Sequence, residues 1–346
     1  MSNLDLLLFL GSGASAPFGL PTMEQLVYTI EKEIEKKSSN DTKRLYNTVK
    51  DFSIAVYKYV DLELIFTILN DIAERRKFME LGITSTFLYR KLDPTFKKAD
   101  KFLEQNQSIA HTLLKTIKAH VRKKLILTSK QEQEIRKTHS LFFESLKEKF
   151  SWKEDANIHC SIYTTNYDRV IETYFADNTY LSDLWEREMG TDILKVKNAD
   201  VDRSYYKLIK LHGSLDWFQL EDGRIVKLEV AKKMYLGKKI ENEMMIFPIQ
   251  QKDLYLYPWY NLFRAFKLSL NQAKNWLVIG YNFNDEYIRN IFLQEFRDEH
   301  KFVIVSPNAL DLKSKFAKLE KSKSINFIPL KFDDDTISEI VSDLQS

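Results

Sequence analysis

The sequence predicts an α/β protein: a Rossmann-like, doubly wound, mostly parallel sheet of about six strands, with a large α-helical insertion and a small β-hairpin. Short apolar runs bounded by polar or turn residues recur along the chain, and helical patterns separate most of them. The first run ends in a glycine turn, and a long stretch after residue 40 contains only one glycine and one proline. The runs span residues 6–10, 159–163, 206–211, 276–279, 302–305 and 325–330.

The first run, residues 6–10, leads directly into the turn Gly-Ser-Gly-Ala-Ser-Ala at 11–16. A buried strand followed by Gly-x-Gly is typical of a nucleotide loop, whose backbone N–H groups approach a pyrophosphate, and also of a tight turn without a ligand. A dehydrogenase places an acidic residue about 20 positions on, at the end of a second strand. Glu31 and Glu33 stand near that spacing but inside a predicted helix, so the dehydrogenase pattern fails. That helix is indicated by a capping-box pattern and by apolar residues at helical spacing: Thr22 and Gln25, then Leu26, Ile30 and Ile34.

The stretch rich in Lys, Glu, Gln, Leu and Phe predicts a helical insertion over 41–150, within a core formed by 1–40 and 151–346. It has no low-complexity linker, so we expect it to pack on the core. Two roles stay open for it: a cap over the ligand cleft, or a surface for oligomers or a partner protein.

Two strand-like runs, 215–220 and 225–228, flank Asp222-Gly223. Asp-Gly between such runs is a strong hairpin signal. The hairpin follows His212 directly, so we expect it to form a wall of the site.

Composition describes an ordinary soluble protein of 346 residues with 44% hydrophobic residues. Lys and Arg number 52 against 49 Asp and Glu, a net charge of +3 that gives no strong signal for nucleic acid or a membrane surface. Cys160 is the only cysteine, which excludes an internal disulfide and a Cys-rich zinc site. The start of the chain lacks a basic segment, and its apolar run is too short for a signal peptide, so we expect a cytoplasmic location.

Parallel sheets with helices on both faces bind ligands beyond the carboxyl ends of their strands. The residues that follow five of the predicted strands are therefore candidates. They are Gly11, Ser12 and Gly13; Thr165, Asn166, Tyr167 and Asp168; His212, Gly213 and Ser214; Gly280, Tyr281 and Asn282; and Ser306, Pro307 and Asn308. Each has a structural alternative: a histidine at a strand end is often only a hydrogen-bonding group, and Asn166 or Asp168 could cap a helix that begins at Tyr167.

Taken together and in order, four motifs resemble the sirtuin superfamily, and more closely the bacterial sirtuin-like proteins of antiphage defence. The similarity covers roughly residues 1–30 and 155–310. The motifs are Gly11-Ser12-Gly13-Ala14-Ser15 with Gly19-Leu20-Pro21, Thr165-Asn166-Tyr167-Asp168, Leu211-His212-Gly213-Ser214, and Ile279-Gly280-Tyr281-Asn282-Phe283-Asn284-Asp285.

The resemblance implies that NAD is the ligand and that its nicotinamide–ribose bond is cleaved. Three residues match catalytic positions of the family: Asn166 holds the nicotinamide ribose and a water, Asp168 binds the carboxamide, and His212 is the general base. Other positions match the binding of pyrophosphate, adenosine or ribose. They are Gly11, Ser12, Gly13, Ala14, Ser15, Thr165, Gly213, Gly280, Tyr281, Asn282, Ser306 and Asn308.

The chain departs from the protein deacylases of that superfamily in two respects. Deacylases carry a four-cysteine zinc module, which one cysteine cannot build, and a glutamine where this chain has Thr165. We therefore expect no zinc, no cofactor beyond NAD as substrate, and attack by water in place of an acetyl-lysine oxygen. The expected activity is NAD hydrolysis to nicotinamide and ADP-ribose. Transfer or cyclisation of ADP-ribose, and a nucleotide-binding sensor without turnover, stay open.

Unregulated hydrolysis of NAD would kill the cell that makes the enzyme. We therefore expect an effector that is inactive at rest and is controlled by homo-oligomerisation or by a protein partner. The resemblance implies that the partner is encoded nearby, as an ATPase or translocase, a nucleotide-cleaving enzyme or an Argonaute-like protein.

Overall fold

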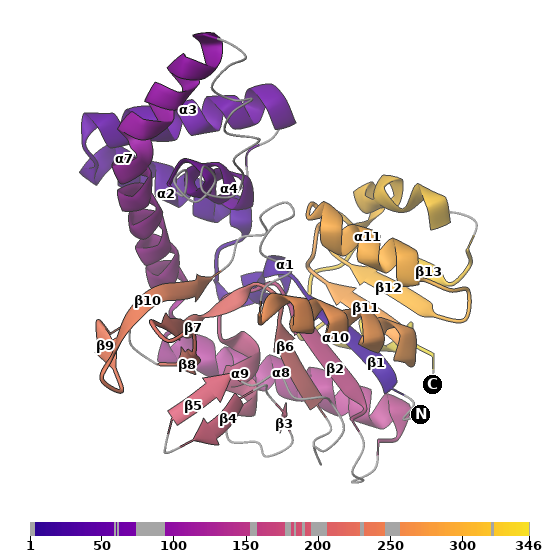
Figure 1. The fold of residues 1–346 in the computed structure, drawn as a ribbon. Coiled ribbons are helices and arrows are strands. Elements are labelled where there is room, and N and C mark those ends of the chain that lie inside the picture. Colours follow the sequence, from indigo (N-terminus) through magenta and orange to yellow (C-terminus); the bar gives the residue numbers. More distant parts are fainter. Residues whose placement is uncertain are drawn as a thin grey trace. The chain divides into compact units, whose positions relative to one another are not determined.

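Within the part of the chain that the structure describes, seven parallel strands form the main sheet, in the order β13-β12-β11-β1-β2-β6-β3 (Figure 1). The structure is a computed structural model that describes residues 4–58, 60, 62–73, 94–152, 158–176, 181–182, 185–188, 191–194, 206–228, 232–245, 257–319 and 322–345. The strands are β1 (Leu4–Leu10), β2 (Cys160–Thr164), β3 (Leu181–Ser182), β6 (Tyr206–Lys210), β11 (Ala273–Ile279), β12 (Lys301–Val305) and β13 (Ile325–Ile328). All six predicted strands are confirmed, and β3 adds a short seventh.

Strand β1 shows why the sheet could be predicted from apolar runs. Alternate side chains of a strand point to opposite faces, so a strand covered on both faces needs apolar residues at every position. Leu6 and Leu8 are fully buried in the hydrophobic cluster on one face, and Leu7 and Phe9 in the cluster on the other. The doubly wound fold class is therefore confirmed.

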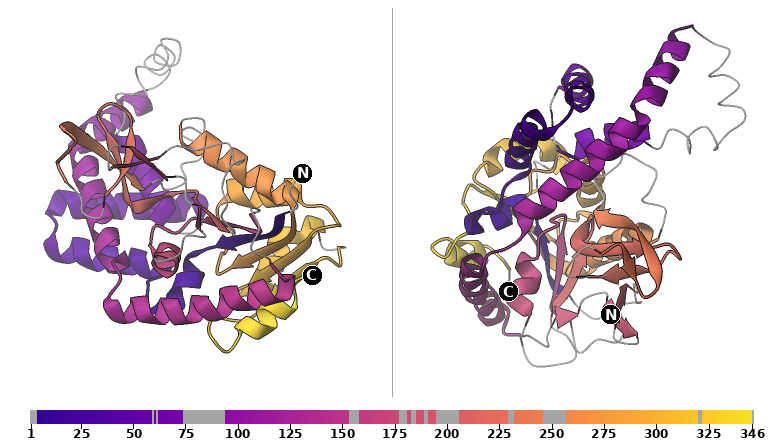
Figure 2. Two further views of the ribbon diagram at one scale, coloured as in Figure 1. Left: turned by 90° about the horizontal axis from the view of Figure 1, so that it is seen from below. Right: turned by 90° about the vertical axis from the view of Figure 1, so that its left-hand side faces the viewer.

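Helices cover both faces of this sheet (Figure 1). One face packs against α10 (Trp259–Gln272), α11 (Glu286–Glu295) and the 3-10 segment η3 (Ala309–Leu319). The other packs against α8 (Ser129–Phe150), α9 (Val170–Phe175) and α12 (Ile337–Ser342). Figure 2 shows α12 beside α8 on that face. Directly after β1 come the short α1 (Ser12–Ser15) and the 3-10 turn η1 (Ala16–Phe18).

The predicted hairpin is confirmed as part of a larger antiparallel sheet with the strand order β4-β5-β8-β7-β10-β9. Phe218 pairs with Val226 across the hairpin, and Gly223 in its turn has φ of +83°, a conformation that glycine adopts without strain. The strands are β4 (Trp185–Glu188), β5 (Thr191–Leu194), β7 (Gly213–Leu220), β8 (Ile225–Lys227), β9 (Met234–Tyr235) and β10 (Lys238–Met245).

The described residues divide into two units: a sheet unit, from 4–22 and 126–345, and a helical unit within 23–125. The helical unit contains α2 (Met23–Lys37), α3 (Asn40–Tyr57), α4 (Leu62–Ala73) and α7 (Pro94–Leu125). Its core includes the predicted apolar positions of α2 together with residues of α4 and α7: Leu26, Ile30, Ile34, Leu62, Ile65, Leu69, Leu113 and Val121.

These limits differ from the expected insertion, 41–150, at both ends. Helix α2 packs with α3, α4 and α7, and so goes with the helical unit. Helix α8 goes with the sheet unit, because Phe142, Phe143 and Leu146 lie in the cluster beneath the main sheet. Residues 74–93 of the expected insertion lie outside the described residues. Among the helices described, none is long and apolar enough to cross a membrane.

Candidate functional site

The predicted site residues follow five strands that are neighbours in the sheet. The ends of these strands are in register, because Leu10 pairs with both Thr164 and Ile279, and the pairing continues outward on each side. The row of strand ends is Val305, Ile279, Leu10, Thr164 and Lys210. The chain completes β2 and β6 on one side of β1 before it returns to β11 on the other. The point where the strand order reverses, where doubly wound sheets bind ligands, therefore lies between β1 and β11.

The glycine turn after β1 packs directly against the loop after β11. The N–H of Gly11 donates to the Ile279 carbonyl (2.9 Å), and the N–H of Gly13 donates to the Gly280 carbonyl (2.9 Å). A Cβ on Gly280, whose φ is +65°, would lie 2.2 Å from the Ala14 nitrogen, and one on Gly11 would lie 2.5 Å from the Gly280 oxygen. The glycines are therefore required by the close approach of two backbones. In this structure the amides of Gly11 and Gly13 are hydrogen-bonded to β11 and to the loop that follows it, and the approach of the turn to a pyrophosphate stays a prediction.

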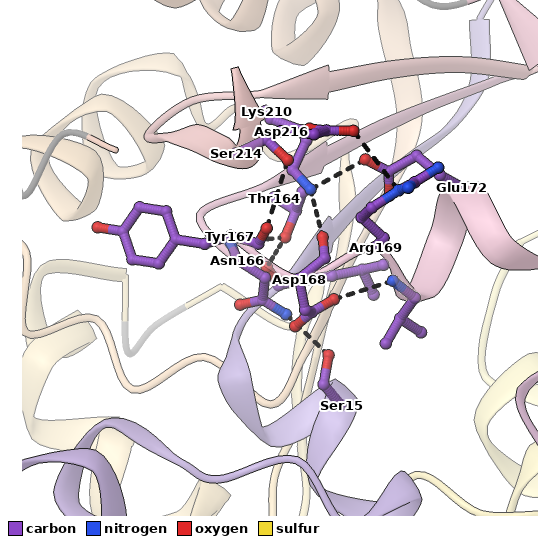
Figure 3. A network of polar contacts seen from close by, with 12 residues as sticks. Ser15, Thr164, Asn166, Tyr167, Asp168, Arg169, Glu172, Lys210, Ser214 and Asp216 are labelled. Carbon is purple, nitrogen blue, oxygen red and sulfur yellow. Dashed lines mark hydrogen bonds and ion pairs between the residues drawn. The ribbon is translucent and has the colours of Figure 1, made fainter. Parts of the chain in front are cut away.

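Asn166 joins the loop after β2 to the glycine turn. Its Nδ2 donates to the Gly11 carbonyl (2.9 Å) and to Ser15 Oγ (3.1 Å), as Figure 3 shows for Ser15. A carbonyl oxygen only accepts, so the partner Gly11 fixes which end of the amide faces the turn. The backbone N–H of Asn166 donates to Thr164 Oγ1 (2.9 Å), whose hydroxyl in turn donates to the Leu10 carbonyl (2.9 Å). Within the described part of the chain, Asn166 Oδ1 accepts no hydrogen bond, which leaves an oriented acceptor at the strand ends.

Asp168 is buried beside this amide. Its Oδ1 accepts a hydrogen bond from the N–H of Val170 (3.0 Å), the first residue of α9. The N-cap position of that helix is Arg169, and the helix begins at Val170 and not at Tyr167. Burial raises the pKa of the Asp168 carboxyl, and the charge of Lys210 opposes that rise. The Nζ of Lys210 donates to the backbone oxygen of Asp168 and to Glu172 Oε1 (3.0 Å), which ties this loop to β6 and α9 (Figure 3).

The second sheet supports the same loop from β7. The N–H of Leu215 and the hydroxyl of Ser214 both donate to the Tyr167 carbonyl, at 3.1 and 3.3 Å. Asp216, also on β7, places Oδ2 3.5 Å from Nε of Arg169 (Figure 3). These contacts hold the loop that carries Asn166 and Asp168, whereas the expected role of the hairpin as a wall of the site stays a prediction.

A small cavity lies between these groups. The space open to the centre of a water-sized sphere is ≈ 10 Å³, about the room that one water molecule needs. Ser15, Asn166 and Asp168 are among the polar residues that line it. Its full lining is Leu10, Ala14, Ser15, His139, Thr164, Asn166, Asp168, Val170, Ile171 and Glu172.

His139 of α8 lines this cavity, and sequence reasoning missed it. Its Nδ1 lies 3.1 Å from the Ile135 carbonyl, which can only accept, so this nitrogen carries the proton. Burial lowers the pKa of His139 to about 4, and the ring is neutral at physiological pH. A histidine on the apolar face of a helix in the expected insertion carries no sequence signal that would assign it to a site formed by strand ends.

His212 follows β6 and is buried, with 2% of its side chain exposed. Its Nε2 lies 3.6 Å from Oδ2 of Asp285, a residue whose side chain is 7% exposed. The described lining of the cavity does not include His212. The structure therefore brings Asn166, Asp168 and Ser15 together around one cavity and places His212 at the end of the adjacent strand.

The other predicted binding residues divide into packing and surface positions. The ring of Tyr281 lies 4.9 Å from that of Phe9 in the core, and a Cβ on Gly213 would meet the Met244 oxygen at 1.8 Å. Asn282 is exposed, and its Oδ1 accepts from the Asn284 N–H (3.0 Å). The rest are half-buried or exposed after their strands: Ser12, Thr165, Ser306 and Asn308. Within the described residues, no three His, Cys, Asp or Glu side chains gather as metal ligands would.

Residues 160–328 match the family model described as a SIR2-like domain. Among solved structures, the chain is similar to a mutant Sir2 homologue in complex with 2′-O-acetyl ADP ribose (13% identity, TM-score 0.47, 99% of this chain and 92% of that one). It is also similar to a Sir2 homologue–NAD complex (12%, 0.47, 99% and 90%) and to Sir2 bound to an acetylated peptide (12%, 0.40, 99% and 93%). No curated protein matches the sequence.

Proposed function

We propose that the protein is an NAD hydrolase, which cleaves the nicotinamide–ribose bond to give nicotinamide and ADP-ribose. The proposal starts from the match of residues 160–328 to the family model of a SIR2-like domain. The match includes the second, third and fourth motifs on which the resemblance to the sirtuin-like family rests, and that resemblance is confirmed. One observation carries the proposal: Asn166 is tied to the glycine turn and to Ser15, beside Asp168, around a cavity of water size.

The chemistry needs groups of these kinds. When the nicotinamide–ribose bond breaks, its electron pair goes to the ring nitrogen and positive charge develops on the ribose. Asn166 Oδ1 is suited to accept a hydrogen bond from a ribose hydroxyl or from a water, and the carboxyl of Asp168 to hold the carboxamide of the leaving group. A water then forms a bond to the ribose carbon and loses a proton, for which His212 is the base. Such proton transfer contributes roughly 10² to 10⁴ in rate.

Water is the favoured nucleophile over a side chain of the protein. Cys160 is fully buried in β2, and burial raises the pKa of its thiol, so the thiolate that a nucleophile requires is disfavoured. The resemblance implies that a deacylase would carry a glutamine in place of Thr165 and four cysteines in place of one. Both differences disfavour the deacylase reaction. Transfer and cyclisation of ADP-ribose use the same bond cleavage, and their products differ.

We infer that the hydrolase is a regulated effector that depletes NAD in antiphage defence. Free NAD hydrolysis is harmful to the cell, so activity requires control. The helical unit is the part of the chain we assign to that control, through a second copy or through a partner protein encoded nearby. Such control predicts low activity of the isolated protein.

The test is NAD consumption by the purified protein, alone and with the products of the adjacent genes. Nicotinamide release is measured by chromatography, and the ribose product is identified by mass. We expect nicotinamide with ADP-ribose as the sole second product, and loss of both in Asn166→Ala and His212→Ala. Asn271→Ala, on the exposed side of α10, is the matched control and should behave as the wild type. Equal behaviour of wild type and both site variants under every activating condition would overturn the assignment. A cyclic ADP-ribose, or ADP-ribose attached to an acceptor, would show that the reaction is cyclisation or transfer and not hydrolysis. Stoichiometric binding without turnover would indicate a sensor.

A further inference from the structure

We propose that Asp285 is a positioning residue that orients the imidazole of His212, an inference that rests on the proposed function of this site. The two side chains follow strands that lie on opposite sides of β1. Nε2 of His212 and Oδ2 of Asp285 are 3.6 Å apart, and 2% and 7% of the two side chains are exposed. A buried carboxylate that faces a buried imidazole influences the orientation of the ring and which ring nitrogen carries the proton.

The pair bridges distant parts of the sheet. His212 follows β6, whereas Asp285 begins α11 after β11, and β1 and β2 lie between those strands. Neighbouring strands are about 4.8 Å apart, so three strand spacings correspond to about 14 Å. The loops after β6 and β11 must therefore reach toward each other over the ends of β1 and β2, where Asn166 and the glycine turn lie.

The carboxylate is held in a fixed orientation. Its Oδ1 accepts hydrogen bonds from the N–H groups of Tyr287 (2.9 Å) and Ile288 (3.2 Å), as the N-cap of α11. The loop before it is also held, since Lys315 Nζ donates to Asn282 O (2.7 Å) and to Asn284 Oδ1 (2.6 Å). With Oδ1 committed to the helix, Oδ2 is the oxygen that faces His212.

This geometry gives the two nitrogens of the imidazole different roles. A carboxylate opposite Nε2 favours the tautomer with its proton on Nε2 and leaves Nδ1 as the basic nitrogen. In the proposed reaction Nδ1 takes the proton that the attacking water loses, while the Nε2 proton stays between His212 and Asp285. The carboxylate then stabilises the imidazolium. A distance of 3.6 Å exceeds that of a hydrogen bond, and catalytic hydrogen bonds commonly shorten when substrate binds.

Two substitutions separate positioning from helix capping. Asp285→Asn and Asp285→Ser both keep an N-cap residue, since Asn, Ser and Asp cap helices comparably. The first removes the charge and the second also removes the reach to His212. Asp222→Asn, which removes an exposed carboxylate of the hairpin turn, is the matched control.

We expect both Asp285 variants to unfold at a temperature close to that of the wild type and to lose at least about 10-fold in kcat for nicotinamide release. The KM for NAD should change by less than about 2-fold, because the base acts on the chemical step. In the His212→Ala background, Asp285→Asn should cause no further loss. Wild-type kcat in Asp285→Asn, or the same loss with and without His212, would overturn the role of Asp285.

A second readout does not depend on turnover. Two-bond ¹H–¹⁵N spectra of protein labelled with ¹⁵N-histidine report which ring nitrogen carries the proton, and His212→Ala identifies the signal. We expect the Nε2–H form in the wild type and a change in Asp285→Ser. An identical His212 signal in both proteins would overturn the inference even if NAD were never cleaved. Failure of the proposed function alone would leave the spectral change intact while nicotinamide release was absent.

Discussion

The side-chain amide of Asn166 donates a hydrogen bond of 2.9 Å to the backbone oxygen of Gly11, a residue 155 positions earlier in the chain. This contact, with the one to Ser15, converts two separate motifs into one site. It also uses both N–H directions of the amide, so that the Asn166 oxygen is the part left to meet a ligand.

Replacement of Asn166 by aspartate tests this arrangement at constant size. A carboxylate cannot donate, so Asn166→Asp places an acceptor against the Gly11 oxygen. We expect nicotinamide release to fall by about 100-fold or more, because misplacement of a catalytic group has costs of that order. The unfolding free energy should fall by about 1–3 kcal/mol, the cost of an unsatisfied polar group. Nicotinamide release and urea unfolding measure the two effects, with Asn271→Ala on the exposed side of α10 as the control. Near-wild-type activity of Asn166→Asp would contradict the role of this amide.

Replacement of Asp168 should leave the stability of the protein intact and should reduce its activity. Burial raises the pKa of its carboxyl, so the folded state binds a proton more readily than the unfolded state does. The contribution of Asp168 to stability therefore falls as pH rises from the unfolded pKa through the folded one. Asp168→Asn keeps an acceptor for the Val170 N–H and removes the charge. We expect an unfolding free energy at pH 8 at least equal to that of the wild type, with nicotinamide release strongly reduced. A variant that is both destabilised and active would reverse this assignment.

His139 should make the stability of the protein depend on pH. Its pKa is about 4 in the folded state, because the ring is buried, and about 6.5 when the chain unfolds. Between these values the unfolded chain binds the extra proton, so stability is complete above pH 6.5 and is lost as pH falls toward 4. The loss amounts to about 3 kcal/mol. Urea unfolding from pH 7 to pH 4 should show this slope, and His139→Phe should reduce it by that amount. An equal slope in both proteins would show that His139 is not responsible.

The contact of Gly280 with the glycine turn should be essential to the fold. A Cβ at Gly280 would lie 2.2 Å from Ala14 N and 2.3 Å from Gly13 C, so Gly280→Ala must separate the loops after β1 and β11. We expect a loss of more than about 3 kcal/mol in unfolding free energy, as in severe overpacking. Gly223→Ala is the control: its φ is also positive, but a Cβ there meets nothing within 4 Å, and it should cost about 1–2 kcal/mol. Urea midpoints compare the two, and equal losses would mean that backbone conformation, not contact, requires Gly280.

Much of the site could be predicted because it depends on local pattern. An apolar run followed by a turn marks a strand end, and parallel strands present those ends at one edge. Asn166, Asp168 and His212 are candidates on this ground, and the structure places each just after its strand. Asp285 is the last residue of the motif at 279–285, but no local pattern in the sequence indicates its contact with His212. His139 had none either, since its place at the cavity depends on how α8 packs against α9 and η1.

The sequence by itself determined the parallel sheet, its strands and the residues at their ends, because continuous apolar runs and helical spacing are properties of neighbouring positions. Only the tertiary structure decided how those ends are used. It assigned the amides of Gly11 and Gly13 to β11 and its loop, turned the Asn166 amide toward the glycine turn, and set the carboxylate of Asp285 opposite His212. Such contacts join residues that are far apart in the chain, and their distances depend on how closely two backbones can approach.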